Sequence, residues 1–310
     1  MRQEGRRHCE HCLMAKHKDG RVEYFHRALE AKLVTFSGLT VSLGFEFIGN
    51  VDGEYVKQDC ELKSFRRLAP RLKKLFPHLR ICILGDGLYA CDPVMELLES
   101  MGWHYFFSFP PERIPTLAAE AEARLAASPS NALRAHDAVN ECPVTYRWTD
   151  TIKYRSHFVR TVKADFQPEG EKAFTLGYLT DSRIDKSNVQ ELVNQGGRQR
   201  AKIENSFNTQ KNHGYKLDHP YGAQGHALKN YYAVIQIAHL IHQLMLRTDL
   251  LGKLSGAQNP LLKCAWTVYR TIHGFVRELV DALRYGVISG VDRLKELSKS
   301  IQIRFTHNTS

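Results

Sequence analysis

A short apolar run, Ile81-Cys82-Ile83-Leu84, ends abruptly at Gly85-Asp86-Gly87, and it restricts the possible folds more than any other feature of this sequence. Four apolar residues in succession are typical of a strand that is buried on both faces, as in parallel sheets. A helical pattern precedes the run, and a helix (93–100) and a second strand (105–109) follow it. This order predicts an α/β sheet with Asp86 at the carboxyl end of a strand, where ligands bind in open α/β sheets.

The patterns on either side of this run divide the chain further. Alternating apolar residues predict a hairpin with strands in 22–36 and 39–48. Apolar residues at helical spacing predict a helix from Leu62 to Leu75, with Asp59 as its N-cap and a kink at Pro70. The expected segments are an irregular N-terminal segment (1–20), a first core part (21–110), an insertion with one helix and several strands (111–180), a second core part with a long helix from 187 to 212 (181–250) and C-terminal helices (251–310). The strands of the insertion are expected in 144–150, 156–166 and 172–180. Apolar helices are expected at about 226–250, 261–285 and 290–302.

Basic residues gather in two stretches. The formal net charge is +10, from 43 Lys and Arg against 33 Asp and Glu. The stretch 62–80 holds seven basic residues and no acid, and the stretch 194–216 holds five basic residues and a single acid, Glu204. In the first stretch the basic residues fall between the apolar positions, so we expect them on the solvent side of the helix. Dense positive charge of this kind attracts phosphate backbones.

Two acids stand out by position. Asp86 follows the apolar strand between glycines that leave room for a metal ion or a phosphate, although an Asp-Gly turn without further role is the simpler interpretation. At about 100° per residue, Arg200, Glu204 and Lys211 fall within about 40° of one another, with Phe207 beneath them. A surface ion-pair ladder is the simpler interpretation of that face. Together, sparse acids in basic surroundings suit DNA phosphodiester transfer, in which carboxylates hold Mg²⁺ and cations bind phosphates.

The segment Arg200-Ala-Lys-Ile-Glu204-Asn-Ser-Phe-Asn-Thr-Gln-Lys211 resembles the Tyr-x2-Arg-x3-Glu-x6-Lys signature of one large group of insertion-sequence DDE transposases. The Arg, Glu and Lys positions match in spacing, whereas Gly197 stands where the group has Tyr. The segments KQDCELKSFRRLAPRLKKLFP, ICILGDGLYA and ENSFNTQKNHGY resemble the same group. The similarity covers most of residues 20–230.

The resemblance implies a ribonuclease H-like α/β fold with a mixed sheet, a strand-rich insertion and a helical C-terminal region. By position, Asp86 matches the second catalytic acid of the group and Glu204 the third, and the resemblance implies that both bind Mg²⁺ or Mn²⁺. Arg200 and Lys211 match the cations that handle DNA phosphates in catalysis. The implied activity is metal-dependent DNA strand cleavage followed by strand transfer. The residues expected to bind DNA are Arg198, Arg200, Lys202, Lys211, His213 and Lys216.

The first acid of the group, usually in Asp-Gly-Thr on a core strand ahead of the hairpin, has no counterpart at that position. Asp59, which follows the hairpin, is better explained as a helix cap than as a replacement for this acid. The acids before Val22 are Glu4, Glu10 and Asp19, and none lies in an apolar strand. We therefore expect an N-terminally truncated copy whose sheet lacks its first strand, which binds Mg²⁺ weakly and does not cleave DNA by itself. Unpaired backbone groups in that gap should lower the stability of the chain.

The motif His8-Cys9-Glu10-His11-Cys12 resembles half of a zinc site. A structural zinc needs four ligands, and His17 and His26 are later candidates, although their spacing matches no finger pattern. The seven cysteines lack the spacing of a disulfide framework, so free thiols are the simpler expectation.

The expected partner is double-stranded DNA, as transposon ends and as target DNA, with a homodimer left open as the assembly. The most apolar stretch, 231–246, is too short and too polar to cross a bilayer. Together with the resemblance, this implies a cytoplasmic, DNA-associated bacterial protein that has no contact with a membrane. Two alternatives are a non-catalytic DNA-binding remnant of a transposase and a metal-dependent nuclease unrelated to transposition.

Overall fold

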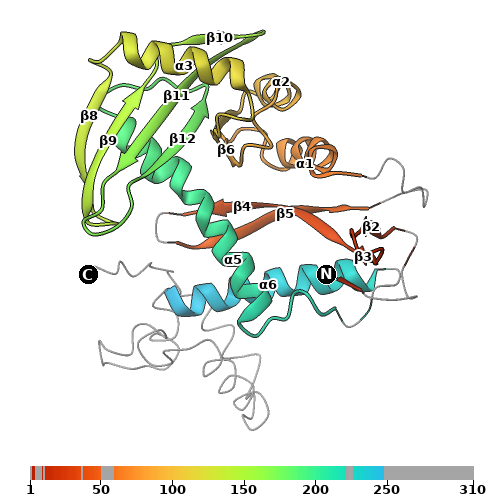
Figure 1. Cartoon of the computed structure of the whole chain (residues 1–310). Helices are drawn as coiled ribbons and strands as arrows, with labels where there is room; N and C mark the ends of the chain where they lie inside the picture. Colours follow the sequence, from red (N-terminus) through yellow and green to blue (C-terminus); the bar gives the residue numbers. More distant parts are fainter. Residues whose placement is uncertain are drawn as a thin grey trace, which may run out of the picture. The chain divides into compact units, whose positions relative to one another are not determined.

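The computed structural model describes residues 2–3, 9, 11–35, 38–49, 59–220, 222 and 226–247 (Figure 1). The chain divides into two compact units. The split unit consists of Met1–Asp59 and Lys202–Ser310, and the α/β unit consists of Cys60–Ala201. The split unit is discontinuous in sequence, because its two parts flank the whole α/β unit. No helix among the described residues is long and apolar enough to cross a membrane.

The α/β unit contains a seven-stranded mixed sheet, which confirms the predicted α/β class. Its strands are β6 (Cys82–Gly85), β7 (His104–Ser108), β8 (Ala132–Asp137), β9 (Cys142–Trp148), β10 (Ile152–Tyr154), β11 (His157–Phe166) and β12 (Phe174–Thr180). The strand order is β6-β7-β12-β11-β9-β8, with β10 paired to β11. The pair β6–β7 is parallel, and the other pairs are antiparallel.

Helices lie on both faces of this sheet. Its helical segments are α1 (Glu61–Leu75), α2 (Asp92–Ser100), α3 (Pro115–Ala127), α4 (Val189–Glu191), the π-helical η1 (Leu192–Gly196) and the 3-10 segment η2 (Gly197–Gln199). On one face of β11, His157 contacts two acids of α2 and Lys163 pairs with an acid of α3. On the other face, Val162 and Phe166 belong to the buried cluster that includes Val193 of η1. Alternation along β11 thus divides its side chains between the two helical layers.

The strands of the expected insertion (111–180) belong to the same sheet as β6 and β7, because β12 pairs directly with β7. One expectation for this unit needs correction. Strand β6 was expected to be buried on both faces, but it is the terminal strand of its sheet and Cys82 is exposed. Because β6 has a sheet neighbour on one side within the described residues, its other apolar side chains are half-buried.

Within its described residues, the split unit contains two small sheets and two helices. Its elements are β1 (Arg2–Gln3), β2 (Leu13–Lys16), β3 (Val22–Phe25), β4 (Arg27–Val34), β5 (Thr40–Ile48), α5 (Arg200–Asn212, from Lys202 onward) and α6 (Ala227–Arg247). The first three strands form an antiparallel sheet in the order β1-β3-β2, and β4 and β5 form the predicted hairpin. The segment 1–20 is therefore not irregular throughout, because Leu13 is buried and β2 pairs with β3 along its whole length.

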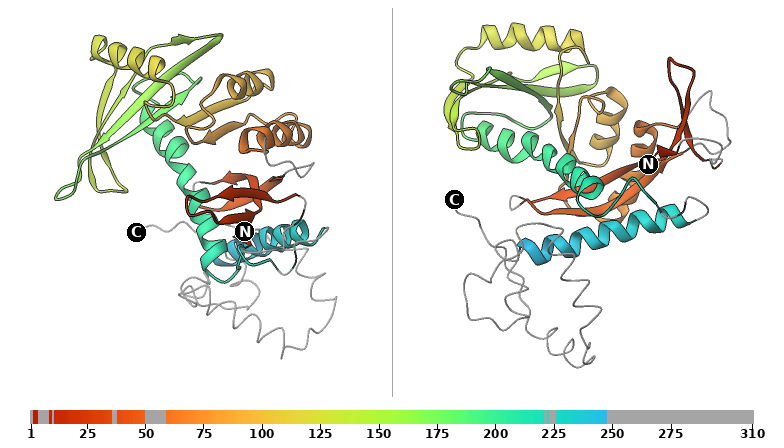
Figure 2. Two further views of the ribbon diagram at one scale, coloured as in Figure 1. Left: turned by 45° about the vertical axis from the view of Figure 1, so that its right-hand side comes forward. Right: turned by 60° about the horizontal axis from the view of Figure 1, so that its bottom comes forward.

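Helix α6 lies along the hairpin β4–β5, as two further views show (Figure 2). Tyr232 of α6 packs against Phe45 and Phe47 of β5, with ring centroids 4.8 and 5.7 Å apart. Leu217 and Ile235 complete this small core. The predicted helix 226–250 is confirmed as α6, whereas the helices expected in 261–285 and 290–302 lie outside the described residues.

The long helix expected from 187 to 212 is interrupted before Arg200. Gly196 leaves the helical conformation, with φ −100° and ψ −92°, between η1 and η2. Gly197 lies against a neighbouring ring, since a Cβ there would be 2.3 Å from Cε1 of Tyr178. Gly197 therefore allows a close approach of the helix to the Tyr178 ring that a larger residue would prevent.

The N-cap of helix α1 lies one residue later than expected. Cys60 is its N-cap, and the carboxylate of Asp59 instead accepts a hydrogen bond from the backbone N–H of Gly49 at 3.3 Å. The helix continues through Pro70 to Leu75. The Asp59 carboxylate therefore binds the backbone just after β5, and Cys60 takes the N-cap position of α1.

Candidate functional site

Asp86 lies directly after β6, at the carboxyl end of the parallel pair β6–β7, as the sequence predicts. Its side chain is exposed, and its Oδ1 accepts a hydrogen bond from the backbone N–H of Leu88 at 2.8 Å. An Asp that binds the backbone two residues ahead stabilises a tight turn. The turn thereby holds the carboxylate at the end of the sheet.

The glycines beside Asp86 are required by packing. A Cβ on Gly85 would lie 2.9 Å from the ring of Phe107, and a Cβ on Gly87 would lie 2.8 Å from Pro110. The sequence alone suggests that these glycines leave room for a metal ion or a phosphate. The structure provides a steric reason for both of them, so they carry no information about a ligand.

Glu61 is a second acid linked to this turn, and sequence reasoning missed it. The hydroxyl of Tyr89 donates a hydrogen bond to Oε1 of Glu61 at 2.6 Å. Burial raises the pKa of Tyr89 above its ordinary value, and the negative charges of Glu61 and Asp86 raise it further. Tyr89 therefore stays protonated and orients Glu61. In the sequence, Glu61 resembles an ordinary first-turn acid of a helix, which gives no signal of this contact.

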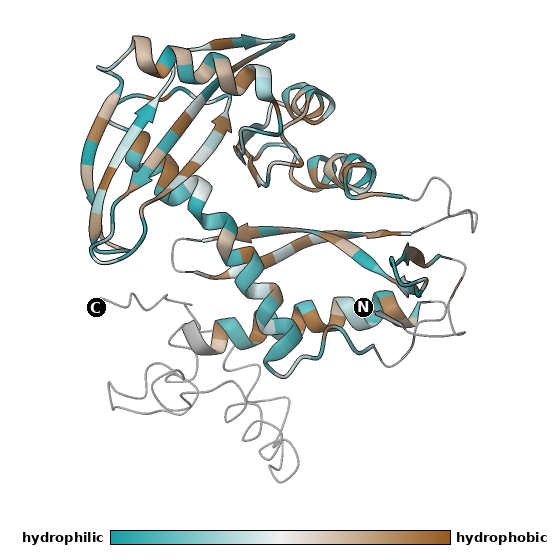
Figure 3. Ribbon diagram, viewed as in Figure 1, coloured by the Kyte–Doolittle hydropathy of each residue, from teal (hydrophilic) through white to brown (hydrophobic). Residues whose placement is uncertain are grey.

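Arg200, Glu204 and Lys211 all lie on α5, and its largely hydrophilic character is visible in Figure 3. Glu204 and Lys211 are exposed, and Arg200 is half-buried. The buried residues of α5 are Ser206 and Gln210. At about 100° per residue these two lie about 120–160° around the helix from Glu204. The predicted catalytic face is therefore directed away from the interior of the split unit.

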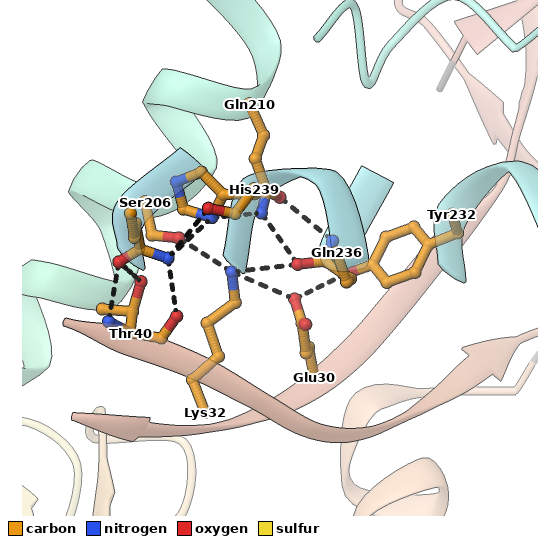
Figure 4. Close-up of polar contacts among 9 residues, drawn as sticks. Glu30, Lys32, Thr40, Ser206, Gln210, Tyr232, Gln236 and His239 are labelled. Carbon is orange, nitrogen blue, oxygen red and sulfur yellow. Dashed lines mark hydrogen bonds and ion pairs between the residues drawn. The ribbon is translucent and has the colours of Figure 1, made fainter. Parts of the chain in front are cut away.

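A buried polar network holds the inner face of α5 (Figure 4). Nζ of Lys32 donates to Oγ of Ser206 at 2.8 Å and to Oε1 of Gln236 at 3.4 Å, and it lies 3.3 Å from Oε2 of Glu30. The side chains of Lys32 and Glu30 are 1% and 0% exposed. Burial raises the pKa of Glu30 and lowers that of Lys32, while the attraction between the two groups opposes both shifts.

Side-chain amides extend this network to α6. Nε2 of Gln210 donates to Oε1 of Gln236 at 2.8 Å, and Nε2 of Gln236 donates back to Oε1 of Gln210 at 3.1 Å. Gln243 both accepts from the backbone N–H of Thr40 and donates to its carbonyl. Paired amides of this kind set the rotation of one helix against another, because each group would be left unsatisfied after a slip. The network thereby fixes the direction of Glu204 within the split unit.

Arg198, expected to bind DNA, is engaged inside the α/β unit. Its Nη1 lies 2.5 Å from Oδ1 of Asp137, whose side chain is 1% exposed, and its guanidinium lies over the ring of Phe166. Although burial raises the pKa of Asp137, hydrogen bonds from Arg198 and Asn140 hold it below its ordinary value. A buried carboxylate needs its partner cation, so Arg198 has a structural role in this unit.

The other residues expected to bind DNA differ in exposure. Lys202 is half-buried and donates to the carbonyl of Thr35 at 3.3 Å. Lys211, His213 and Lys216 are exposed at the end of α5 and in the loop that follows. These three are better placed to meet a phosphate than Lys202 is.

Helix α1 presents a basic face to solvent, as the sequence predicts. Its buried residues are Ser64, Phe65, Leu68, Ala69 and Leu72. Its exposed basic residues are Lys63, Arg66, Arg67, Arg71 and Lys74. No acid lies between 62 and 80, so this face concentrates positive charge on one element of the α/β unit.

Only some of the residues expected to bind zinc lie close together in the structure. Cys9, Cys12 and His26 come together in the split unit, and they are the one group of three or more metal-binding side chains found among the described residues. His17 is outside this group and pairs with Glu23 at 3.1 Å. His8 and Glu10 of the same motif lie outside the described residues.

Asp86 belongs to the α/β unit and Glu204 to the split unit. Each position is defined within its own unit, so their convergence on a common metal ion stays a prediction. No protein-family model and no curated protein matches this sequence, and its family membership therefore stays a prediction too.

Proposed function

We propose that this chain is a DDE-type DNA transposase with a ribonuclease H-like core. The observation that carries the proposal is the placement of the two acids. Asp86 ends a strand of a parallel pair, and Glu204 lies on the solvent side of α5 with Arg200 and Lys211. A sheet end and a rigid helix are the supports that hold catalytic side chains with the precision the chemistry needs.

The sheet pairings support the same fold. The resemblance implies a central strand that precedes the hairpin and carries the first acid. Among the described residues, β4 and β5 pair only with each other, and β6 is the last strand of its sheet. Both are edges that such a strand would occupy in a ribonuclease H-like sheet.

The donor set fits Mg²⁺ or Mn²⁺, because Asp86 and Glu204 offer the carboxylate oxygens that hard divalent cations prefer. A bound metal would neutralise the charge on the attacking and leaving oxygens of the phosphodiester. Asp86 and Glu204 would hold it, while Arg200 and Lys211 would bind the flanking phosphates. The cations of α1 would bind the DNA backbone further along the duplex.

The first acid of the group is not among the residues of this chain. Two carboxylates would then have to hold a metal pair with four positive charges, so we propose that the 310-residue chain takes up Mg²⁺ weakly and does not cleave DNA by itself. The basic face of α1 favours a second candidate function, in which the chain binds DNA without catalysis. DNA binding is common to both functions and is tested first.

The salt dependence of DNA binding tests the role of α1. Replacing Lys63, Arg66 and Lys74 with Gln removes three exposed cations of one helix. We plot the logarithm of the DNA association constant against the logarithm of the salt concentration. If each of the three cations contacts a phosphate, the magnitude of the negative slope should become smaller by up to about 2.7, or about 0.9 per contact on a duplex. A triple Gln variant of Lys153, Lys172 and Lys186 is the matched control, because it removes the same charge from exposed positions elsewhere in the α/β unit. Equal slopes for the two triple variants would contradict the proposed interface.

Iron-mediated cleavage of the polypeptide tests whether the two acids share a metal ion. Fe²⁺ can replace Mg²⁺ at carboxylate sites, and peroxide with ascorbate then cuts the backbone close to the ion. We expect cuts near both Asp86 and Glu204 when DNA is bound, and we expect both to disappear in Asp86→Asn. Cuts that persist near Glu204 in this variant would show that the acids do not form one site. Supercoiled DNA nicking, measured in parallel with Mg²⁺ and Mn²⁺, should be absent.

A further inference from the structure

Three metal-binding side chains meet beside the three-stranded sheet of the split unit. Sγ of Cys9 and Sγ of Cys12 are 3.5 Å apart, and Nε2 of His26 lies 3.4 Å from the first and 3.3 Å from the second. Cys12 is 1% exposed and His26 is 7% exposed. The cysteines precede β2 and the histidine follows β3, so the antiparallel pairing of β2 with β3 brings the three side chains together.

The three distances match the edges of a zinc coordination tetrahedron. Bonds of about 2.3 Å to sulfur and about 2.05 Å to nitrogen, at tetrahedral angles, put two sulfur atoms about 3.8 Å apart and a sulfur and a nitrogen about 3.6 Å apart. The observed separations fall short of these values by about 0.3 Å or less. A disulfide would need sulfur atoms about 2.05 Å apart, so no disulfide joins the two cysteines here.

The surrounding structure is one that a metal ion would stabilise. Strands β1, β2 and β3 contain two, four and four residues, and sheets of this size bury too little apolar surface to be stable by themselves. The cysteine turn, in which Cys12 N–H donates to the carbonyl of Cys9, also packs closely on the end of β5. A Cβ on Gly49 would lie 2.9 Å from the carbonyl oxygen of His11 in that turn.

We propose that Cys9, Cys12 and His26 bind a structural zinc ion. Two thiolates and an imidazole select zinc over Mg²⁺, which prefers oxygen. The ion would join the start of β2, the end of β3 and the start of β4, and so secure the small sheet to the hairpin β4–β5. The three side chains fill three positions of the tetrahedron, and a fourth ligand completes it. This site is chemically separate from Asp86 and Glu204.

Metal analysis of the purified full chain tests the proposal. We expect about one zinc ion per chain, as for a single tetrahedral site. Cys12→Ser and His26→Asn should lose the zinc, whereas Cys60→Ser and His17→Asn should keep it. Cys60 and His17 are exposed residues of the same types outside the cluster, which makes them matched controls. Cobalt in place of zinc should show sulfur-to-cobalt charge-transfer absorption and the intense visible bands of tetrahedral coordination, and these bands report the fourth ligand.

Alkylation of the wild-type protein gives a measurement that does not depend on how the variants fold. Peptide mass mapping should find Cys9 and Cys12 protected until a chelator is added, while Cys60 reacts with or without it. Three results would overturn the proposal. They are a wild-type chain that stays metal-free after reloading, full zinc content in Cys12→Ser, and a Cys9–Cys12 disulfide in protein purified without reductant.

Discussion

Replacing Gly197 with Ala should destabilise the α/β unit, because the added methyl group has no room. A Cβ at this position would lie 2.3, 2.5 and 2.7 Å from Cε1, Cζ and Cδ1 of Tyr178. Carbon atoms in contact are about 3.5–4.0 Å apart, so the ring would have to move by about 1 Å. Tyr178 is 5% exposed and packs on Phe106 with ring centroids 5.0 Å apart, so that movement disturbs the core. Overpacking of this kind costs about 1–3 kcal/mol, and we expect the upper half of that range.

Gly196 provides a control in the same helix break. A Cβ there would lie 3.7 Å from the ring of Phe106, which is an ordinary contact. Gly196→Ala should therefore lower the free energy of unfolding by much less than Gly197→Ala. Urea titration followed by circular dichroism measures both values.

A double-mutant cycle identifies the ring as the cause. Tyr178→Ala removes the obstacle, so Gly197→Ala should be nearly neutral in that background. Equal costs for the two glycine variants, or an unchanged cost for Gly197→Ala without the ring, would refute the reasoning. A Tyr side chain at 197 would likewise occupy the space that the Tyr178 ring already fills.

Two further predictions concern buried charges. Replacing Arg198 with Ala leaves Asp137 buried without its cation and should lower the free energy of unfolding by about 3 kcal/mol at neutral pH. Because the pKa of Asp137 is lowered in the folded state, this stabilisation is present above about pH 4 and is lost as the pH falls through the folded-state pKa, so thermal melts of wild type and Arg198→Ala should converge in acid. Replacing Lys32 with Met leaves Glu30 unpaired and should cost about 3–5 kcal/mol in urea titrations. Adding Glu30→Gln should recover most of that loss, and a double variant as unstable as Lys32→Met would contradict the role of the ion pair.

Much of the fold could be predicted because the relevant signals are local. Helices α1 and α2 and strands β7 and β11 lie close to their expected positions, since their apolar residues recur with a clear period. Strand β8 escaped prediction because charged and imidazole side chains, Arg134 and His136, interrupt its pattern, and β10 is too short to show one. The edge position of β6 depends on which strands pair with it, and the composition of a single strand does not specify that.

The candidate site could be predicted in part, because some of its signals are also local in the sequence. Asp86 after a strand and Glu204 between two cations are features of contiguous sequence. The network around Lys32 could not be predicted, because its partners lie on α5 and α6 and appear in the sequence only as polar interruptions of helices. The role of His26 could not be predicted from its spacing, because the spacing from Cys12 follows no zinc-finger pattern. Only the pairing of β2 with β3 places His26 beside the cysteines.

The split unit is assembled from pieces that leave the ribosome far apart in time. Lys32 bonds to Ser206, 174 residues later, and Thr40 bonds to Gln243, 203 residues later. At about 5–20 residues per second, translation separates these partners by about 10–40 s. All strands of the α/β sheet have been synthesised before α6 appears, whereas Phe45 and Phe47 must wait for Tyr232. During synthesis the aromatic side chains of the hairpin β4–β5 thus lack their α6 partner for that interval, in which a chaperone can bind them.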